Sequence, residues 1–543
     1  MLVLCVLAAA LGLLAGGTAW ILIKGIAVLT NLALFHRWGT TLPNFADLPI
    51  GPGVVIAAVL GATAVTLLAR WAPIIRGHGI PEAMDAVLTR RSRVSGRTAI
   101  AKPLSAAIAI GTGGPFGAEG PIIVTGGALG SLTGQFLHMS ANERKILLGC
   151  GAAAGMAATF GTPLAAVVLA IELLLFEFSP RAFIPLAVAA SVADGVHVAL
   201  FGDGPLFSVP AHGFSGLGQL PLFAGLGLTC GLLAVLISRG LFTVEATFRR
   251  LPVGEAWHPI VGAVVWASLG LLAPRALGVG YDVIGDALAG RLALATLAGL
   301  AVAKLVIWWI ALASGTSGGT LAPILLISSC FGGMIGELLA RAFPGLGISP
   351  SAFALVAMAA TFGAAARAPF AAIVFLFELT RDYNAILPLM LATVLADLLA
   401  RTLLPHSIMT EKLARRGVAV PAGFHADPLR STPVKAVMTA AGEPAEEGRD
   451  VIVAVEAGES LQTALRRMID QGVDQLPVTD HGRLVGVCTR ADVMAAQLRP
   501  LALEEREQGW LARRASRNGN ALPVEAADPE EAGAQSASRD RTS

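Results

Sequence analysis

The chain contains one apolar segment twice, and this duplication constrains its fold more than any other feature. Residues 156–161 read MAATFG, and residues 358–363 repeat the same six letters. Each copy follows a glycine-proline break, GAEGP at 117–121 and GTLAP at 319–323, and both landmarks recur with an offset of 202 residues. Interrupted hydrophobic segments at matching places in two halves are typical of transporters whose substrate site lies between the repeats. We therefore predict a protein that moves a substrate across a membrane.

Composition also favours a membrane protein. Of the 543 residues, 55% are hydrophobic and 14% are charged, with a mean hydropathy of +0.70, whereas soluble domains carry about 25% charged residues. The net charge of +2 gives no reason to expect a nucleic-acid partner. The five cysteines lie far apart, mostly in apolar runs, so we expect packing roles rather than disulfides or a metal site. The apolar run 1–23 is long enough to span a bilayer, so no cleaved signal peptide is expected.

The first 410 residues predict an all-α polytopic membrane domain. Apolar runs of unequal length alternate with short polar breaks, so some helices are expected to end near the membrane midplane. The two halves of this domain lie at roughly 1–205 and 206–410. Basic residues at 412–416 favour a cytoplasmic C-terminus, in a plasma membrane or a bacterial inner membrane.

Beyond residue 410 the sequence changes character. We predict a linker over 411–432, a small cytoplasmic α/β domain over 433–497 and a disordered tail over 498–543. Within the α/β domain the predicted elements are strands at 452–455, 475–478 and 484–488 and a helix at 459–471.

Glu119 is the acid with the clearest functional signal. It lies in the glycine-rich run 111–121, and no further formal charge follows until Glu143. An ionisable side chain at membrane depth is costly and indicates function by default. Pro121 suits the first turn of a following helix, whose first N–H groups would favour an anion. The alternative is a glycine-rich helix contact with Glu119 directed outward.

Two further breaks could present helix ends to the same cavity. They are GHGIPE at 77–82 and SGGTLAP at 317–323. A single glycine-proline cluster usually marks only a turn, but three in this order and spacing are specific. They resemble the signature motifs of the CLC family of chloride channels and proton-coupled chloride transporters, approximately GSGIP, GxEGP and GxFxP. Further matches at 151–155 and 367–370 extend the resemblance over roughly residues 1–410.

The resemblance implies a fold and a set of roles. The expected fold is a lipid-embedded homodimer with one pore per subunit, each pore built from two inverted halves with broken helices. Chloride or another small anion is the expected substrate, and Glu119 is the expected gate, whose carboxylate competes with the anion until protonation or displacement moves it. Lys102 is expected to make the pore electropositive, with helix capping as the alternative. The implied anion-binding residues are His78, Gly79, Ile80, Gly117, Gly120, Thr320 and Leu321.

The sequence departs from the family pattern at two anion-site positions. His78 stands where chloride-handling members usually have serine and some nitrate-handling relatives have proline. A neutral imidazole donates one hydrogen bond to an anion and a protonated one adds charge. We therefore expect anion affinity to rise on acidification, unless the ring points away from the pore. The family's central tyrosine is expected near 405–408, where none occurs; Tyr281 and Tyr383 lie elsewhere, and His406 is a candidate substitute.

A third departure concerns the proton path. In many exchangers the segment that matches 170–173 carries two adjacent acids, and the second relays protons from the cytoplasm. Leu173 occupies that second position here and cannot carry a proton. This favours a passive, Glu119-gated chloride channel. The alternative is a proton-coupled antiporter with a modified inner route, for which Glu177 is a candidate, while Glu172 and its counterpart Glu378 are expected to make structural contacts.

Residues 432–497 resemble a single CBS domain. VMT at 437–439 resembles its usual entry, and GVCTRAD at 486–492 its closing strand-to-helix turn. The resemblance makes Thr489 and Asp492 candidate contacts of an adenosine nucleotide, with a dimer contact as the alternative; no other cofactor is expected. No nucleophile-base pair or phosphate loop accompanies the apolar core, so we do not expect an enzyme. The proline of GAEGP argues against a fluoride-exporting relative.

Overall fold

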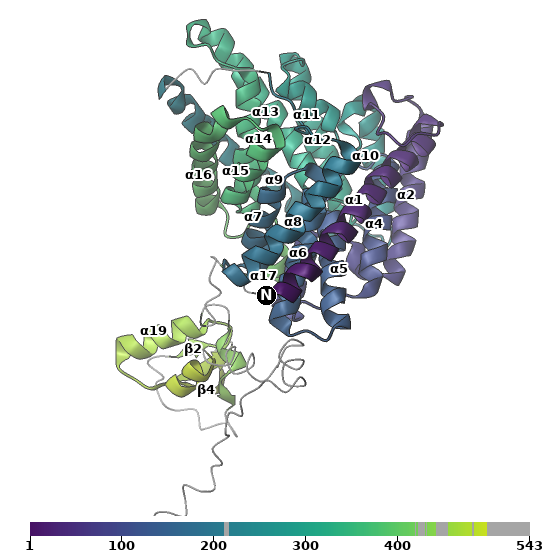
Figure 1. The fold of residues 1–543 in the computed structure, drawn as a ribbon. Helices are drawn as coiled ribbons and strands as arrows, with labels where there is room; N and C mark the ends of the chain where they lie inside the picture. Colours follow the sequence, from purple (N-terminus) through teal and green to yellow (C-terminus); the bar gives the residue numbers. More distant parts are fainter. Residues whose placement is uncertain are drawn as a thin grey trace, which may run out of the picture.

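The structure, a computed structural model, describes residues 1–210, 217–418, 420–421, 429, 432–440, 454–480 and 483–496. A large helical body and a small mixed α/β unit are visible in Figure 1. The predicted tail over 498–543 and residues 419, 422–428 and 430–431 of the predicted linker lie outside the described residues. The first linker residues form the short helix α17 (Glu411–Arg415).

The helical body repeats one order of long and short helices. The first series is α1 (Leu2–Phe35), α2 (Pro52–Trp71), α3 (Ile80–Thr89), α4 (Gly96–Gly111), α5 (Glu119–Phe136), α6 (Ala141–Phe160), α7 (Pro163–Ala170) and α8 (Pro180–Phe201). The second is α9 (Leu220–Arg249), α10 (His258–Leu272), α11 (Tyr281–Leu288), α12 (Leu294–Ala313), α13 (Leu321–Ala342), α14 (Pro350–Ala366), α15 (Pro369–Thr380) and α16 (Ile386–Leu403). Helices at matching places in the two series pack on matching neighbours: α5 lies along α6 as α13 lies along α14, and α1 along α8 as α9 along α16.

The duplicated hexamer occupies the same place in both series. Residues 156–160 form the last turns of α6, and 358–363 lie near the end of α14, where both copies are buried. Glycine permits the close packing of the neighbouring helix, because a Cβ on Gly130 of α5 would lie 1.9 Å from the carbonyl oxygen of Leu147 in α6. Small residues at such contacts are the usual way for membrane helices to approach each other.

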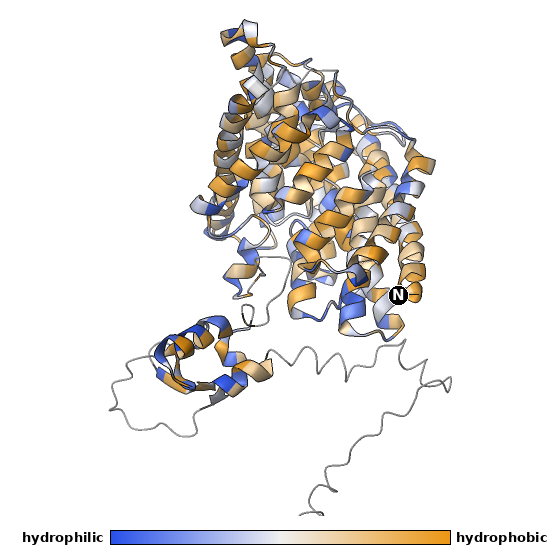
Figure 2. Ribbon diagram, turned by 60° about the vertical axis from the view of Figure 1, so that its left-hand side comes forward, coloured by the Kyte–Doolittle hydropathy of each residue, from blue (hydrophilic) through white to orange (hydrophobic). Residues whose placement is uncertain are grey.

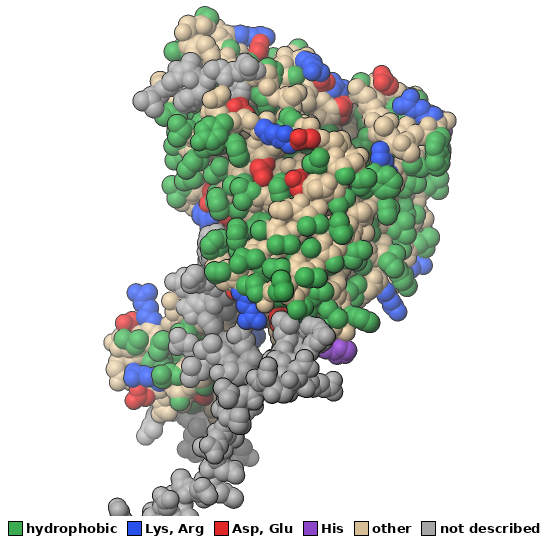
Figure 3. All heavy atoms as spheres, viewed as in Figure 1, with side chains coloured by type: hydrophobic (Ala, Val, Ile, Leu, Met, Phe, Trp, Pro, Cys, Tyr) green, Lys and Arg blue, Asp and Glu red, His purple; other side chains and the backbone are tan. Residues whose placement is uncertain are grey.

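The outside of the helical body is apolar. Orange, hydrophobic ribbon dominates its helices in Figure 2, and hydrophobic side chains cover most of its face in Figure 3. Within the described residues, seven helices are long and apolar enough to cross a membrane. Large apolar side chains such as Leu60 on α2, Leu232 on α9 and Val302 on α12 are more than half exposed. Contiguous apolar surface of this extent fits contact with lipid.

Two glutamates tie the short helices of the two series together. Glu378 of α15 accepts hydrogen bonds from the N–H groups of Leu164 (3.0 Å) and Ala165 (2.7 Å) at the start of α7. Glu172, just after α7, accepts one from the N–H of Ala371 (2.8 Å) at the start of α15. Each acid satisfies N–H groups that lack a partner within their own helix. The predicted structural role of this pair is confirmed.

The small unit holds a four-stranded sheet in the order β1-β4-β3-β2. Its elements are β1 (Thr439–Ala440), β2 (Val455–Glu456), α19 (Leu461–Gln471), β3 (Gln475–Asp480) and β4 (Arg483–Thr489). The described α19 starts two residues later than predicted, because the Ser460 side chain accepts a hydrogen bond from the N–H of Thr463 and caps the helix. Residues 452–453 of the first predicted strand lie outside the described part.

Candidate anion site

Four glycine-containing loops meet at the centre of the helical body, each just before a helix. They precede α3, α5, α11 and α13, and two reciprocal hydrogen bonds join Gly117 and Gly319 at 2.8 and 3.3 Å. The N–H of Gly77 donates to the carbonyl of Thr316 (3.4 Å), and that of Gly278 donates to Gly113 (3.1 Å). The sequence predicted three of these loops. The fourth, at 278–280, was missed.

Close approach explains why these loops are rich in glycine. A Cβ on Gly120 would lie 1.9 Å from the carbonyl oxygen of His78, and one on Gly79 would lie 2.6 Å from that of Gly120. Gly79 also has φ +100, a conformation that L side chains rarely adopt. Non-helical backbone at membrane depth persists only where protein buries it or a cavity borders it. Both the close approach of the backbones and the positive φ of Gly79 favour glycine in these loops.

Glu119 is the first residue of α5 and is 1% exposed. Its Oε1 accepts a hydrogen bond from the hydroxyl of Tyr281 at 2.9 Å. Its Oε2 has no partner among the described residues and lies beside two loops, since a Cβ on Gly117 or Gly319 would be 1.7 or 2.8 Å from it. Glu119 therefore faces the loop crossing, which excludes the alternative that it points outward.

The predicted anion-binding residues are gathered around this carboxylate, but not all offer a free N–H group. The N–H of Gly79 donates to Glu82 Oε2 at 2.7 Å, and that of Gly117 donates to Gly319. In this structure these two glycines therefore contribute close approach rather than a free N–H donor. Ile80, Gly120, Thr320 and Leu321 lie in the first turns or caps of α3, α5 and α13, where N–H groups lack intrahelical acceptors.

His78 is buried in the loop before α3. It is 1% exposed, and neither ring nitrogen has a hydrogen-bond partner in the part of the chain that the structure describes. Buried polar atoms are rarely left unpaired in native proteins. The imidazole is therefore available to a small ligand at the crossing. Thr320 Oγ1 is also buried and unpaired among the described atoms.

Two buried lysines hold the loops before α3 and α11. Lys102 Nζ donates to the carbonyls of Ile75 (2.7 Å) and Gly77 (2.9 Å), and Lys304 Nζ donates to those of Gly278 (2.7 Å) and Ala276 (3.1 Å). Both side chains are 0% exposed. Lys102 thus bonds the backbone carbonyls of the loop before α3, and its buried ammonium group lies directly behind that loop.

Lys304, the loop 278–280 and Tyr281 were not predicted, although the sequence holds a signal for each. Lys304 follows Lys102 by 202 residues, the offset of the repeated hexamer. Gly278 and Gly280 follow Gly77 and Gly79 by 201 residues, which places Tyr281 opposite Ile80. Tyr281 was noted only as lying elsewhere than the tyrosine expected near 405–408, and the structure places its hydroxyl at Glu119.

The three inner candidates lie in different surroundings. His406 is exposed, so it does not replace a buried hydroxyl donor; the neighbouring Ser407 is buried and pairs with Thr410 (3.1 Å). Leu173 is buried. Glu177 pairs with Lys145 at 3.2 Å and its side chain is 37% exposed, so it lies in a surface ion pair.

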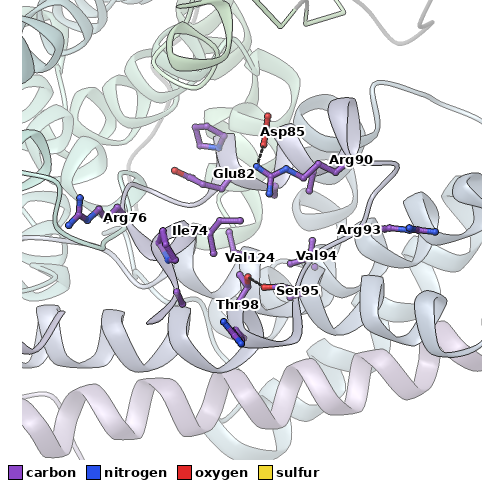
Figure 4. A pocket seen from close by; sticks show the side chains of 18 of the residues that line it. Ile74, Arg76, Glu82, Asp85, Arg90, Arg93, Val94, Ser95, Thr98 and Val124 are labelled. Atoms are coloured by element: carbon purple, nitrogen blue, oxygen red, sulfur yellow. Dashed lines mark hydrogen bonds and ion pairs between the residues drawn. The ribbon is translucent and has the colours of Figure 1, made fainter. Parts of the chain in front are cut away.

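A cavity of about 940 Å³ lies between the starts of α3 and α4 and helix α17. Figure 4 shows Arg76, Arg90 and Arg93 around it, with Asp85 paired to Arg90 at 2.9 Å. Its second acid, Glu82, is bonded to Gly79. The charged residues that line it are Arg76, Glu82, Asp85, Arg90, Arg93, Arg97, Lys412 and Arg416. A cavity with this excess of positive charge raises the local concentration of anions.

In the small unit, Thr489 and Asp492 bond to each other. Asp492 Oδ2 accepts from the N–H (2.9 Å) and the hydroxyl (2.7 Å) of Thr489. The N–H of Asp492 donates back to the Thr489 hydroxyl at 3.2 Å. This arrangement caps the helical residues 490–496.

Broken apolar helices around a buried acid and unpaired donors define a membrane transport protein for a small anion. The family described as voltage gated chloride channel matches residues 60–401, and the CBS domain family matches residues 448–499. The chain therefore belongs to the CLC family and carries a CBS domain, as the sequence motifs predicted.

Similar proteins include exchangers. The H(+)/Cl(-) exchange transporter ClcA of Vibrio campbellii is 30% identical over 369 residues, which cover 67% of this chain and 79% of that protein. A putative chloride channel protein, ClcB-like, from Ralstonia nicotianae is 28% identical over 350 residues, 64% of this chain and 81% of its own. The crystal structure of a slow cyanobacterial Cl−/H+ antiporter superposes with a TM-score of 0.68 at 26% identity, over 76% of this chain and 97% of that one.

Replacement of Lys304 by methionine should destabilise the loop before α11. It removes a charged donor from two well-placed carbonyls, and hydrogen bonds to charged groups contribute about 1.5–3 kcal/mol each. We expect the free energy of unfolding to fall by about 3 kcal/mol. Thermal unfolding in detergent measures the change. Lys24→Met is the control, because Lys24 makes one exposed bond, to Thr40; equal melting temperatures for the two variants would contradict the role of Lys304.

Proposed function

We propose that this protein is a proton-coupled chloride antiporter in which Glu119 handles both ions. The single observation that carries the proposal is the Glu119 carboxylate, buried at the loop crossing with one oxygen unpaired. The exchangers among the similar proteins support coupling over passive conduction. The passive channel that Leu173 favours is the second candidate, and the ClcB-like relative described as a putative channel supports it.

The proposed cycle follows from the chemistry of one acid. An ionised carboxylate at the crossing occupies space that an anion would take and repels it, so the two compete for the same donors. Protonation removes the charge and the competition. Protonation of Glu119 and entry of an anion into the crossing therefore favour each other. For this reason the movement of one ion is linked to the movement of the other.

The proposed anion ligands are the helix-start N–H groups and the His78 ring. Ile80, Gly120, Thr320 and Leu321 would supply backbone N–H groups from three helices, each with the partial positive charge of a helix N-terminus. Lys102 and Lys304 would add full positive charges behind the loops. These backbone N–H groups, the His78 ring and the two lysine charges would together recognise a small spherical anion by its negative charge.

The inner proton route differs from the two-acid pattern. Leu173 carries no proton, and Glu177 is held by Lys145 and by Ser179 at 2.9 Å. We propose that water molecules, rather than a second acidic side chain, carry protons between the cytoplasm and Glu119. The assembly proposed from the family is a homodimer in lipid with the CBS domain in the cytoplasm, in a plasma membrane or a bacterial inner membrane.

Loss of the gate acid should abolish coupling. In proteoliposomes with a chloride gradient, the reversal potential of the wild type should shift in fixed proportion when a pH gradient is added. Glu119→Ala should conduct chloride with a potential that ignores pH, because no carboxylate remains to carry the proton. Glu177→Ala is the matched comparison and should stay coupled. A wild-type potential that stays at the chloride value would establish the channel instead.

His78 should make chloride binding depend on pH. A protonated ring adds a positive charge beside the anion, so binding of the anion and of the proton favour each other, and chloride affinity should rise as pH falls. Isothermal titration at pH 5.5 and 7.5 would show a smaller change in His78→Ser than in the wild type. To separate this effect from that of Glu119, the comparison is made in the Glu119→Ala background. Equal pH dependence in both proteins there would remove the hypothesis.

Adenosine nucleotide binding by the CBS domain remains a proposal. In the structure the side chains of Thr489 and Asp492 bond to each other and cap a helix. A bound phosphate and ribose would have to use the same side-chain groups. Titration of the full-length protein with ATP and AMP should show binding that Asp492→Ala weakens at least tenfold. No binding at millimolar nucleotide would leave the cap as the role of both residues.

A further inference from the structure

Tyr281 contributes the hydrogen bond that holds the gate carboxylate. It is the first residue of α11, in the second half of the helical body, whereas Glu119 begins α5 in the first half. The two lie 162 positions apart in the chain, and their side chains meet at 2.9 Å. The repeat places the apolar Ile80 at the matching position of the first half, so of these two matching positions it is the one in the second half that offers Glu119 a hydroxyl.

The tyrosine ring is fixed in place from several sides. Phe160, at the end of the duplicated hexamer, and Phe207 both meet it edge-on, with ring centroids at 6.4 and 5.9 Å. Helix α11 itself is anchored by Arg275, which pairs with Asp286 at 2.6 Å and with Asp282 at 3.4 Å. A donor held this firmly loses little conformational entropy when it bonds the carboxylate, so its hydrogen bond is effective.

The same ring separates the gate from open space. Tyr281 is partly exposed, while Glu119 behind it is 1% exposed. Tyr281 lines a cavity of about 430 Å³, with Ala118, Thr159 and His197 among its other walls, and a second cavity of about 260 Å³. An anion that enters from the larger cavity meets the tyrosine and the carboxylate bonded to it.

We propose that Tyr281 is a positioning residue that latches Glu119 in its anion-excluding pose and thereby sets the apparent anion affinity. The inference rests on the proposed role of Glu119 as gate. A hydrogen bond present only in the closed pose lowers the fraction of molecules ready to bind an anion. Apparent affinity falls in proportion to that fraction. Removal of the hydroxyl should therefore tighten chloride binding.

The test is a double-mutant cycle on the full-length protein in detergent, with chloride titrated calorimetrically. Tyr281→Phe keeps the ring and removes the hydroxyl, and should lower the Kd for chloride about tenfold. In the Glu119→Ala background the same change should alter Kd less than twofold, because no carboxylate remains to be held. Tyr383→Phe is the matched control, since Tyr383 is the chain's other tyrosine and is 76% exposed.

Two results would overturn the latch. The first is an unchanged Kd in Tyr281→Phe, or binding lost from a folded Tyr281→Phe variant. The second is an equal change with and without Glu119, which would show a purely structural effect. Failure of the proposed function looks different: Glu119→Ala would then retain proton coupling in proteoliposomes, whatever Tyr281 does. Thermal unfolding of each variant in detergent reports, independently of chloride binding, that it is folded.

Discussion

The hydrogen bonds between Gly117 and Gly319 are the contact on which the rest of the structure depends. They join two loops from opposite halves of the chain at the point where four helices begin. Backbone groups within a membrane must find partners inside the protein. The pairing of these loops allows the helices to begin there, with first-turn N–H groups that have no acceptor within their own helix. An anion site can exist only where such a crossing is stable.

Two buried lysines add positive charge to the loop crossing. Lys102 bonds two carbonyls behind the loops and Lys304 bonds three, and neither lysine takes part in an ion pair among the described residues. Their positive charge is costly to bury without a negative partner. Glu119 and an anion bound at the crossing are negative groups that can compensate this positive charge. Under the proposed function, Glu119 and the anion therefore compete within one electrostatic environment, and this competition links the movements of proton and anion.

Repeat symmetry explains both the successes and the misses of prediction. Motifs that resemble those of a family drew attention to 77–82, 117–121 and 317–323, and these loops do meet. Loop 278–280 carries no proline after its second glycine, so its motif is weaker, and it was recognisable only through the 201-residue offset from Gly77 and Gly79. Tyr281 was set aside because the expected tyrosine belongs near residue 405. Symmetry, rather than motif, brings it to Glu119.

By itself the sequence determined the membrane class, the duplicated architecture, the acid at the loop crossing and the CBS domain. Those features depend on apolar runs, repeats and glycine spacing, which are local in the chain. The tertiary structure decided which donors remain free, that Glu119 faces inward, and that its hydroxyl partner comes from the other half. Such contacts join residues 162 or more positions apart. Their geometry depends on how two halves pack, which no local pattern specifies.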